Sequence, residues 1–213
     1  MRKLKFLVSQ AILWMSTPFQ KFLSKSGYQE SDLPEEIIEA SAKLCLPGDI
    51  ILTYETGRPT SRFIPGPMDH AAIVTDLLDI MEAVTDKFVQ DPITKVMNNV
   101  GGVREVGLVP FLYRKNEYVI IRPIYKNDRK INMSAGTFSK TYKGRGYDHQ
   151  FRIDNENIYC SELVYLCYRR FDQKFMEHIS IYDEILPADY LKLTANSNRD
   201  DLRFEIIFDT RTI

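Results

Sequence analysis

Hydrophobic positions recur at steps of three and four along the segment that follows Cys160. The residues of this series are Leu163, Val164, Cys167, Tyr168 and Phe171. The spacing predicts a helix with one apolar face. Good cap residues lie just upstream at Asp154, Asn155 and Asn157, so we expect the helix to begin within a residue or two of Cys160. The thiol would then lie in the first turn, where free backbone N–H groups and the helix dipole favour thiolate over thiol.

Shorter apolar runs predict strands elsewhere in the chain. These runs lie at residues 50–52, 70–74, 80–84, 103–109, 117–122 and 203–208, and Pro123 is expected to end the fifth. Further helices are predicted at 132–143, closed by Gly144, at 186–191, and near Pro34, with Ser31 or Asp32 as the cap of this last, acidic helix. The chain is therefore expected to mix strands with a few helices.

A loop at residues 54–69, rich in glycine and proline, leads into a predicted hairpin. A turn centred on Asp76 would pair residue 70 with 82 and residue 72 with 80, and directly opposed side chains have Cβ atoms about 5 Å apart. We therefore expect His70 and Glu82 to touch, and a carboxylate on one ring nitrogen stabilises the imidazolium. The alternative is a polar cross-strand pair of no chemical use, and a slip of one residue would separate the two side chains.

The first 29 residues carry five basic side chains, Arg2, Lys3, Lys5, Lys21 and Lys25, and no acidic one. Apolar residues recur at helical spacing between Leu4 and Met15, with Trp14 beside them. The apolar stretch is too short to span a bilayer, and no signal-type cleavage site follows it. Residues 1–26 are therefore expected to form a basic helix at a membrane surface, or else a helix docked on the core. We expect an N-terminal extension over 1–40 and one main domain over 41–213.

Composition narrows the class of protein. The 213 residues are 44% hydrophobic and 27% charged with a net charge of -1, which argues against a general nucleic-acid-binding surface. Three cysteines, Cys45, Cys160 and Cys167, are too few for a disulfide framework, so at least one thiol should be free. A metal site built from His70, His149 and Cys160 lacks the close ligand pair of zinc sites, so we expect no metal and no cofactor.

Several separate motifs follow one another between Leu44 and Asp189. They are Gly48-Asp49-Ile50-Ile51, His70 ahead of small and apolar residues, Glu82-Ala83-Val84, Tyr118 to Arg122, Gly144 to Asp148 with Phe151, and Tyr159-Cys160-Ser161-Glu162. Together they resemble the YiiX/YebB-like branch of the NlpC/P60 superfamily, papain-like cysteine hydrolases with a circularly permuted order. The resemblance implies an α+β fold, an antiparallel sheet or half-barrel with the nucleophile helix packed on it.

The resemblance also implies a catalytic triad. Cys160 matches the nucleophile, His70 the general base, and Glu82 the polar residue that orients the histidine. Tyr147 is a candidate for lining the substrate cleft, with packing at the sheet edge as the alternative. Two departures, Gly146 in place of the usual Pro and Ala72 in place of a frequent Gly, would alter the cleft without removing a catalytic group.

Three functions are compatible with these residues. The first is a thiol hydrolase that cleaves an amide through a thioester, as relatives do on cell-wall-type peptides. The second takes the acyl chain from a lipid, as the similar lecithin:retinol acyltransferase branch does, and the basic N-terminus supports it. The third is a lipid- or peptide-binding module with a silent site. The expected partners are a peptide or acyl-lipid substrate and a membrane surface, without nucleic acid, and the expected location is cytoplasmic or membrane-associated, with an extracytoplasmic one as the alternative.

Overall fold

The computed structural model describes residues 31–55, 64–85, 88–90, 97–99, 101–128, 130–153, 156–177, 184–196 and 199–213. The predicted helix within residues 1–26 and most of the loop at 54–69 lie outside the described residues. Within the described part of the chain, no helix combines the length and the apolar character that a bilayer crossing needs.

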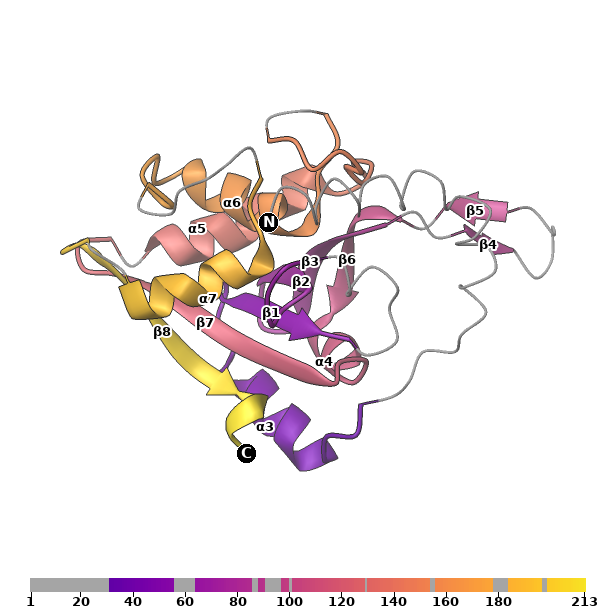
Figure 1. Ribbon diagram of the computed structural model, residues 1–213, viewed down its shortest axis with the longest axis horizontal. Coiled ribbons are helices and arrows are strands. Elements are labelled where there is room, and N and C mark those ends of the chain that lie inside the picture. The colour runs from indigo at the N-terminus through magenta and orange to yellow at the C-terminus, as the bar shows by residue number, and fades with distance from the viewer. Residues whose placement is uncertain are drawn as a thin grey trace.

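A six-stranded antiparallel sheet forms the centre of the molecule, in the order β6-β3-β2-β1-β7-β8 (Figure 1). Its strands are β1 (Ile50–Tyr54), β2 (His70–Val74), β3 (Asp79–Val84), β6 (Gly102–Gly107), β7 (Glu117–Tyr125) and β8 (Leu202–Asp209). Two short strands, β4 (Phe88–Gln90) and β5 (Met97–Asn99), pair separately. The sheet is open and carries helices, which confirms the predicted α+β class.

The sheet has an apolar core on each face, because successive side chains of a strand point to opposite sides. Ile50 and Leu52 belong to the core shared with α6 (Cys160–Arg169), and Ile51 belongs to the other core. The first core also takes in residues of α5 (Lys130–Ser139) and α7 (Pro187–Asn196), and the second those of α3 (Glu35–Leu44) and α4 (Leu108–Leu112). Figure 1 shows α5 and α6 on one side of the sheet and α3 on the other.

Two strand predictions need correction. The run at 103–109 leaves the sheet at Gly107, and its last residues begin α4 instead. Strand β7 does not end at Pro123, which pairs with Phe204 of β8. Pro123 is tolerated because the pairing of β7 with β1 stops at Ile121, so the missing N–H interrupts no ladder on that side.

The helix ends also differ from the expected caps. Helix α3 follows Pro34, and Ser31 accepts a hydrogen bond from the N–H of Leu33 before the helix begins. Helix α5 ends at Ser139 and continues as a short 3-10 turn, η2 (Lys140–Tyr142), and α7 extends past the predicted end to Asn196. A second 3-10 turn, η3 (Thr210–Thr212), follows β8. The expected domain boundary after residue 40 falls inside α3, whose Ser41 hydroxyl lies 2.6 Å from that of Tyr118 on β7.

The hairpin of β2 and β3 forms with a register two residues from the predicted one. Ala72 pairs with Glu82 and Val74 with Ile80, so the expected pairing of 70 with 82 is wrong. The turn of the hairpin causes this shift in register. The Asp76 carboxylate accepts hydrogen bonds from the N–H groups of Leu78 and Asp79, and the turn is wider than expected. A shift of two residues leaves every side chain on the same face of the sheet. His70 and Glu82 therefore become diagonal neighbours on one face.

Candidate active site

Cys160 is the first residue of α6, as the sequence predicts, and its side chain is buried. The cap is Tyr159, not one of the upstream Asp or Asn residues, and its N–H donates to the Glu162 side chain at 3.4 Å. The Tyr159 hydroxyl accepts a hydrogen bond from the N–H of Ile185, and the Tyr190 hydroxyl donates to the carbonyl of Ser161. The segment around α7 therefore fixes the start of α6, which sets the position of the thiol.

The thiol lies against the first residues of β2. The ladder between β2 and β3 ends at the pair Ala72 and Glu82, and the next free N–H, that of Ala71, donates to the sulfur of Cys160. The same sulfur is hydrogen-bonded to the His70 ring. The sulfur therefore lies where the ladder ends, next to an imidazole and a backbone N–H donor. Both groups stabilise a thiolate.

His70 connects Cys160 to Glu82. The ring nitrogen Nε2 of His70 lies 2.9 Å from Oε2 of Glu82, and both side chains are at least 95% buried. Because Nε2 is engaged by the carboxylate, Nδ1 is the ring nitrogen that can exchange a proton with the thiol. The structure therefore brings together all three residues of the predicted triad, although the register that suggested the contact of His70 with Glu82 was wrong.

Two cations near Glu82 were missed by the sequence reasoning. Arg104 on β6 stands opposite Glu82 in the register and donates to Oε1 from Nε at 2.9 Å and from an Nη nitrogen at 2.7 Å. Lys115, which is buried, binds Glu55 at 3.4 Å and lies 4.5 Å from the centre of the Phe111 ring. The only sequence signal for Arg104 was a charged residue inside a predicted strand, because nothing local reveals that β6 pairs with β3.

The three groups shift one another's pKa values. Burial raises the pKa of Cys160 and lowers that of His70. The interaction between the two groups opposes burial in both cases, with Glu82 adding to it at His70 and the N–H of Ala71 at Cys160, so the pKa of Cys160 falls below 9.0 and that of His70 rises above 6.5. Burial also raises the pKa of Glu82, and the contact with His70 and the charges of Lys115 and Arg104 lower it well below its ordinary range. The arrangement favours a thiolate, an imidazolium and a carboxylate in a row.

The other two cysteines lie in different surroundings. Burial raises the pKa of the Cys167 thiol, two turns along α6, far above its ordinary value. Burial and then the charge of Asp49 raise the pKa of Cys45 to about 12. All three thiols are free and buried, so burial does not distinguish Cys160 from the others. Within the described part of the chain, Cys160 is the cysteine with an imidazole beside it.

A family model described as permuted papain-like amidase enzyme, YaeF/YiiX, C92 family, matches residues 44–191, more than half of the chain. The chain belongs to the C92 family. This confirms the resemblance to YiiX-type proteins and, with the open antiparallel sheet, the permuted papain-like fold. The crystal structure of the metalloprotein yiiX from Escherichia coli O157:H7 is similar at 15% identity with a TM-score of 0.41, over 78% of this chain and 89% of that chain. No protein with a curated description matches.

In this C92-family chain, the segment Gly144 to Asp148 packs tightly beside the site. The N–H of Val103 on β6 donates to the carbonyl of Arg145 at 2.8 Å, and a Cβ atom at Gly146 would lie 2.6 Å from the side-chain oxygen of Asn157. Tyr147 is buried in the core shared with α6, with its ring centre 5.1 Å from that of His149. The predicted role of Tyr147 in substrate binding stays a prediction.

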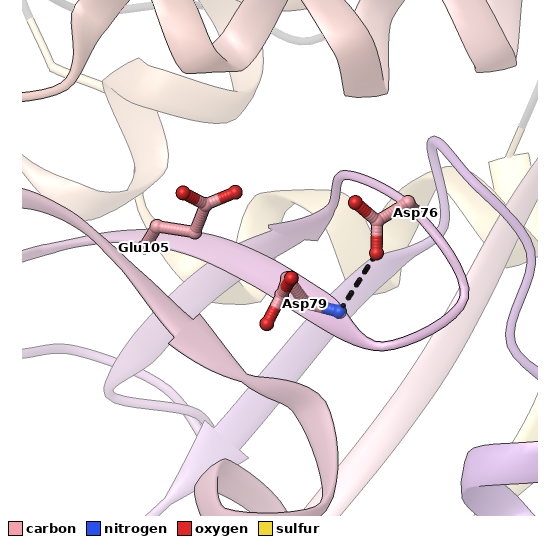
Figure 2. A group of neighbouring side chains, drawn as sticks. All are labelled: Asp76, Asp79 and Glu105. Atoms are coloured by element: carbon pink, nitrogen blue, oxygen red, sulfur yellow. Dashed lines mark hydrogen bonds between the residues drawn. The ribbon is translucent and has the colours of Figure 1, made fainter.

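A cluster of acidic side chains, Asp76, Asp79 and Glu105, lies at the other end of the β2–β3 hairpin (Figure 2). His70 and Val74 are separated by about 13 Å of strand, so the cluster is remote from the thiol. Lys140 binds both Asp76, at 3.0 Å, and Glu105, at 2.8 Å, and Lys143 binds Glu105. These contacts make the cluster a partly exposed network of ion pairs within the C92 domain.

Proposed function

We propose that this chain is a cysteine amidase in which Cys160 is the nucleophile, His70 the general base and acid, and Glu82 the carboxylate that orients His70. The observation that carries the proposal is the position of His70, hydrogen-bonded to the Cys160 sulfur on one side and to Glu82 on the other. Membership of a family described as papain-like amidases supports the same reaction class. Among the described histidines, none influences the pKa of Cys45 or of Cys167, and both pKa values are raised, which supports Cys160 as the reactive thiol.

The reaction begins when the Cys160 thiolate attacks the carbonyl carbon of the substrate amide. A C–S bond forms, and the electron pair of the carbonyl moves to its oxygen, where N–H groups in the first turn of α6 stabilise the negative charge. The imidazolium of His70 then gives its proton to the amide nitrogen as the C–N bond breaks, and the amine leaves. The products of this half-reaction are a free amine and a thioester on Cys160.

Hydrolysis of the thioester completes the cycle. His70, now neutral, takes a proton from water, and the resulting hydroxide attacks the thioester carbon. The C–S bond breaks to release the acid, and the thiolate and imidazolium are restored. Glu82 stays ionised throughout, because its contact with His70 and two further cations hold its pKa low. Its part is to hold the ring in place and to stabilise the imidazolium.

The proposed substrate is an amide of peptide type, and cell-wall-type peptides are the first class to test. A second candidate is an acyl group taken from a lipid by the same thiolate. The basic N-terminal segment with Trp14 favours that candidate, because such a segment suits a membrane surface. The amide is preferred because the residues matched by the amidase family include the whole triad, whereas residues 1–26 lie outside the match.

The test is to trap the covalent intermediate. The protein is incubated with peptidoglycan fragments and phospholipid vesicles together, quenched in acid during turnover, and the Cys160 peptide is analysed by mass spectrometry. We expect a peptidyl mass on Cys160, its absence in Cys160→Ala, and a fall in turnover of at least about a thousandfold in that variant. Cys167→Ala is the matched control on the same helix and should keep both adduct and turnover.

Other outcomes of this experiment would change the proposal. A fatty-acyl mass alone would replace the amide by the lipid substrate. If no adduct appears with either substrate and iodoacetamide also fails to label Cys160, the chain is a binding module with a silent site. Loss of turnover in Cys167→Ala with activity retained in Cys160→Ala would show that the nucleophile is misassigned.

A further inference from the structure

Arg104 occupies an unusual position relative to the proposed triad. The triad residues come from β2, β3 and α6, and Arg104 comes from β6, the strand at the edge of the sheet beside β3. It stands directly opposite Glu82 in the register. The side chains of Arg104, Glu82, His70 and Cys160 therefore form one continuous row of hydrogen bonds.

The two oxygens of Glu82 are divided between two partners. Both bonding nitrogens of Arg104 point to Oε1, at 2.9 and 2.7 Å, and His70 Nε2 contacts Oε2 at 2.9 Å. A carboxylate on a flexible side chain can rotate, and rotation would exchange or withdraw its two oxygens. Two donors fixed on one oxygen oppose that rotation, because a guanidinium is rigid and planar. In this arrangement Oε1 is occupied by Arg104, and Oε2 contacts His70.

Lys115 is a second cation near Glu82. It lines the same small cavity as Glu82 and Arg104, forms an ion pair with Glu55, and lowers the pKa of Glu82 through its charge. Glu82 itself is almost completely buried, whereas about 29% of the Arg104 side chain is exposed. A substitution at Arg104 therefore changes the support of Glu82 with less disturbance of the core than a substitution at Glu82.

We propose that Arg104 is a positioning residue of the active site, which holds Oε1 of Glu82 so that Oε2 stays on His70 Nε2. The proposal rests on the proposed function, since it acts through the triad. Its consequence is that the imidazolium of His70 depends on Arg104 for a fixed carboxylate partner. The charged groups that face this row are Glu82, Arg104 and Lys115, with Glu55 and Arg114 also lining the cavity, and Cys160 on the other side of His70.

The direction in which the pKa of His70 changes distinguishes a positioning role of Arg104 from two simpler roles, one electrostatic and one structural. Removing a positive charge near Glu82 strengthens the negative field at His70 and would raise the pKa of the ring. Releasing Glu82 from its fixed position weakens the contact with Nε2 and would lower that pKa. A purely structural role would reduce the amount of folded protein and leave the pKa of His70 unchanged.

The experiment measures alkylation of Cys160 by iodoacetate against pH, which needs no substrate. The rate should rise as the thiolate–imidazolium pair forms and fall as His70 loses its proton, because the reagent is an anion attracted by the imidazolium. In Arg104→Met we expect the upper apparent pKa to fall by about one unit. Arg104→Lys, which retains the charge and one donor, should recover part of the shift, and Arg122→Lys, the same change in a remote arginine–carboxylate pair, should cause none.

Three results would overturn the proposal. An upper apparent pKa that is unchanged or raised in folded Arg104→Met would leave Arg104 with a structural or a purely electrostatic role. If Arg104→Met does not fold, Arg104→Gln is measured in its place, and an unshifted profile there has the same meaning. A wild-type protein whose Cys160 reacts no faster than Cys45 and Cys167 would instead remove the proposed nucleophile, and the positioning role with it.

Discussion

Asp49 and Glu82 are both buried carboxylates held by an arginine from a neighbouring strand, yet they use that arginine differently. Arg122 places Nε on Oδ1 of Asp49 and an Nη nitrogen on Oδ2, each at 2.7 Å, so one guanidinium engages both oxygens. Arg104 places both nitrogens on Oε1 of Glu82 and leaves Oε2 for His70. Both oxygens of Asp49 therefore bind one arginine, whereas the two oxygens of Glu82 bind Arg104 and His70 separately.

The pKa values of the two carboxyl groups move in opposite directions. Burial raises the pKa of Asp49, and the hydrogen bonds from Arg122 offset it only in part. At Glu82 burial acts the same way, but His70, Lys115 and Arg104 together lower the pKa. The comparison indicates that His70 together with two cations lowers the pKa of a buried carboxyl group, whereas a single arginine does not offset the effect of burial.

The largest effect is expected from Arg122→Met, which should destabilise the protein by about 3–5 kcal/mol. The reason is that the Asp49 side chain is fully buried and would lose its compensating charge. Urea unfolding followed by circular dichroism measures the loss, and turnover per folded molecule should be retained. Arg203→Met is the matched control, since both side chains of its ion pair with Glu205 are exposed, and it should cost less than about 1 kcal/mol. A stable but inactive Arg122→Met would remove the distinction between the two carboxylates.

Next in size is Glu82→Gln, for which we expect turnover to fall by about tenfold to a thousandfold with a smaller loss of stability. The amide still hydrogen-bonds the ring but no longer stabilises an imidazolium. Steady-state kinetics and thermal unfolding of the same preparation separate the two effects. Glu105→Gln, the same change in a partly exposed carboxylate on β6, should leave turnover unchanged. If Glu82→Gln is fully active, the residue that orients His70 lies elsewhere, and Asp69 is the next candidate.

The elements that the sequence predicted well are those set by local periodicity. Helix α6 begins at Cys160, and β2, β3 and β8 lie within about a residue of their expected positions, because apolar spacing is a property of each segment alone. Pro123 was misjudged because its tolerance depends on where the neighbouring strand β1 stops pairing, which is a tertiary fact.

The contact between His70 and Glu82 could be predicted because it depends on local strand parity. The prediction of the site missed Arg104 because that contact depends on tertiary structure. His70 and Glu82 share a face by strand parity, which survived an error of two residues in the register. Arg104 lies 22 residues from Glu82, and the contact depends on the pairing of β3 with β6, across a long connection. A single sequence carries no local mark of such a pairing. The contact between Cys160 and His70, 90 residues apart, entered only through the family resemblance.

The smallest expected effect concerns the stability of the protein in acid. The pKa of Glu82 is lowered in the folded state, so its contribution to stability is present above the unfolded pKa of about 4.3 and is lost as the pH falls toward the folded value. The pKa of His70 is raised, so the His70 contribution is present below about 6.5 and stays constant in this acid range. Asp49 has a raised pKa and acts in the opposite sense, favouring the fold as it takes up a proton.

Comparison of the wild type with the double variant His70→Gln/Glu82→Gln isolates the Glu82 contribution, because Asp49 titrates in both proteins. Between pH 5.5 and pH 3 we expect the wild type to lose on the order of 1–2 kcal/mol more unfolding free energy than the double variant, as urea unfolding at each pH would measure. Equal losses in the two proteins would mean that Glu82 is not held ionised by its neighbours. The contrast with Asp49 would then concern hydrogen-bond geometry alone, and the imidazolium of His70 would lack the charged partner on which the proposed mechanism depends.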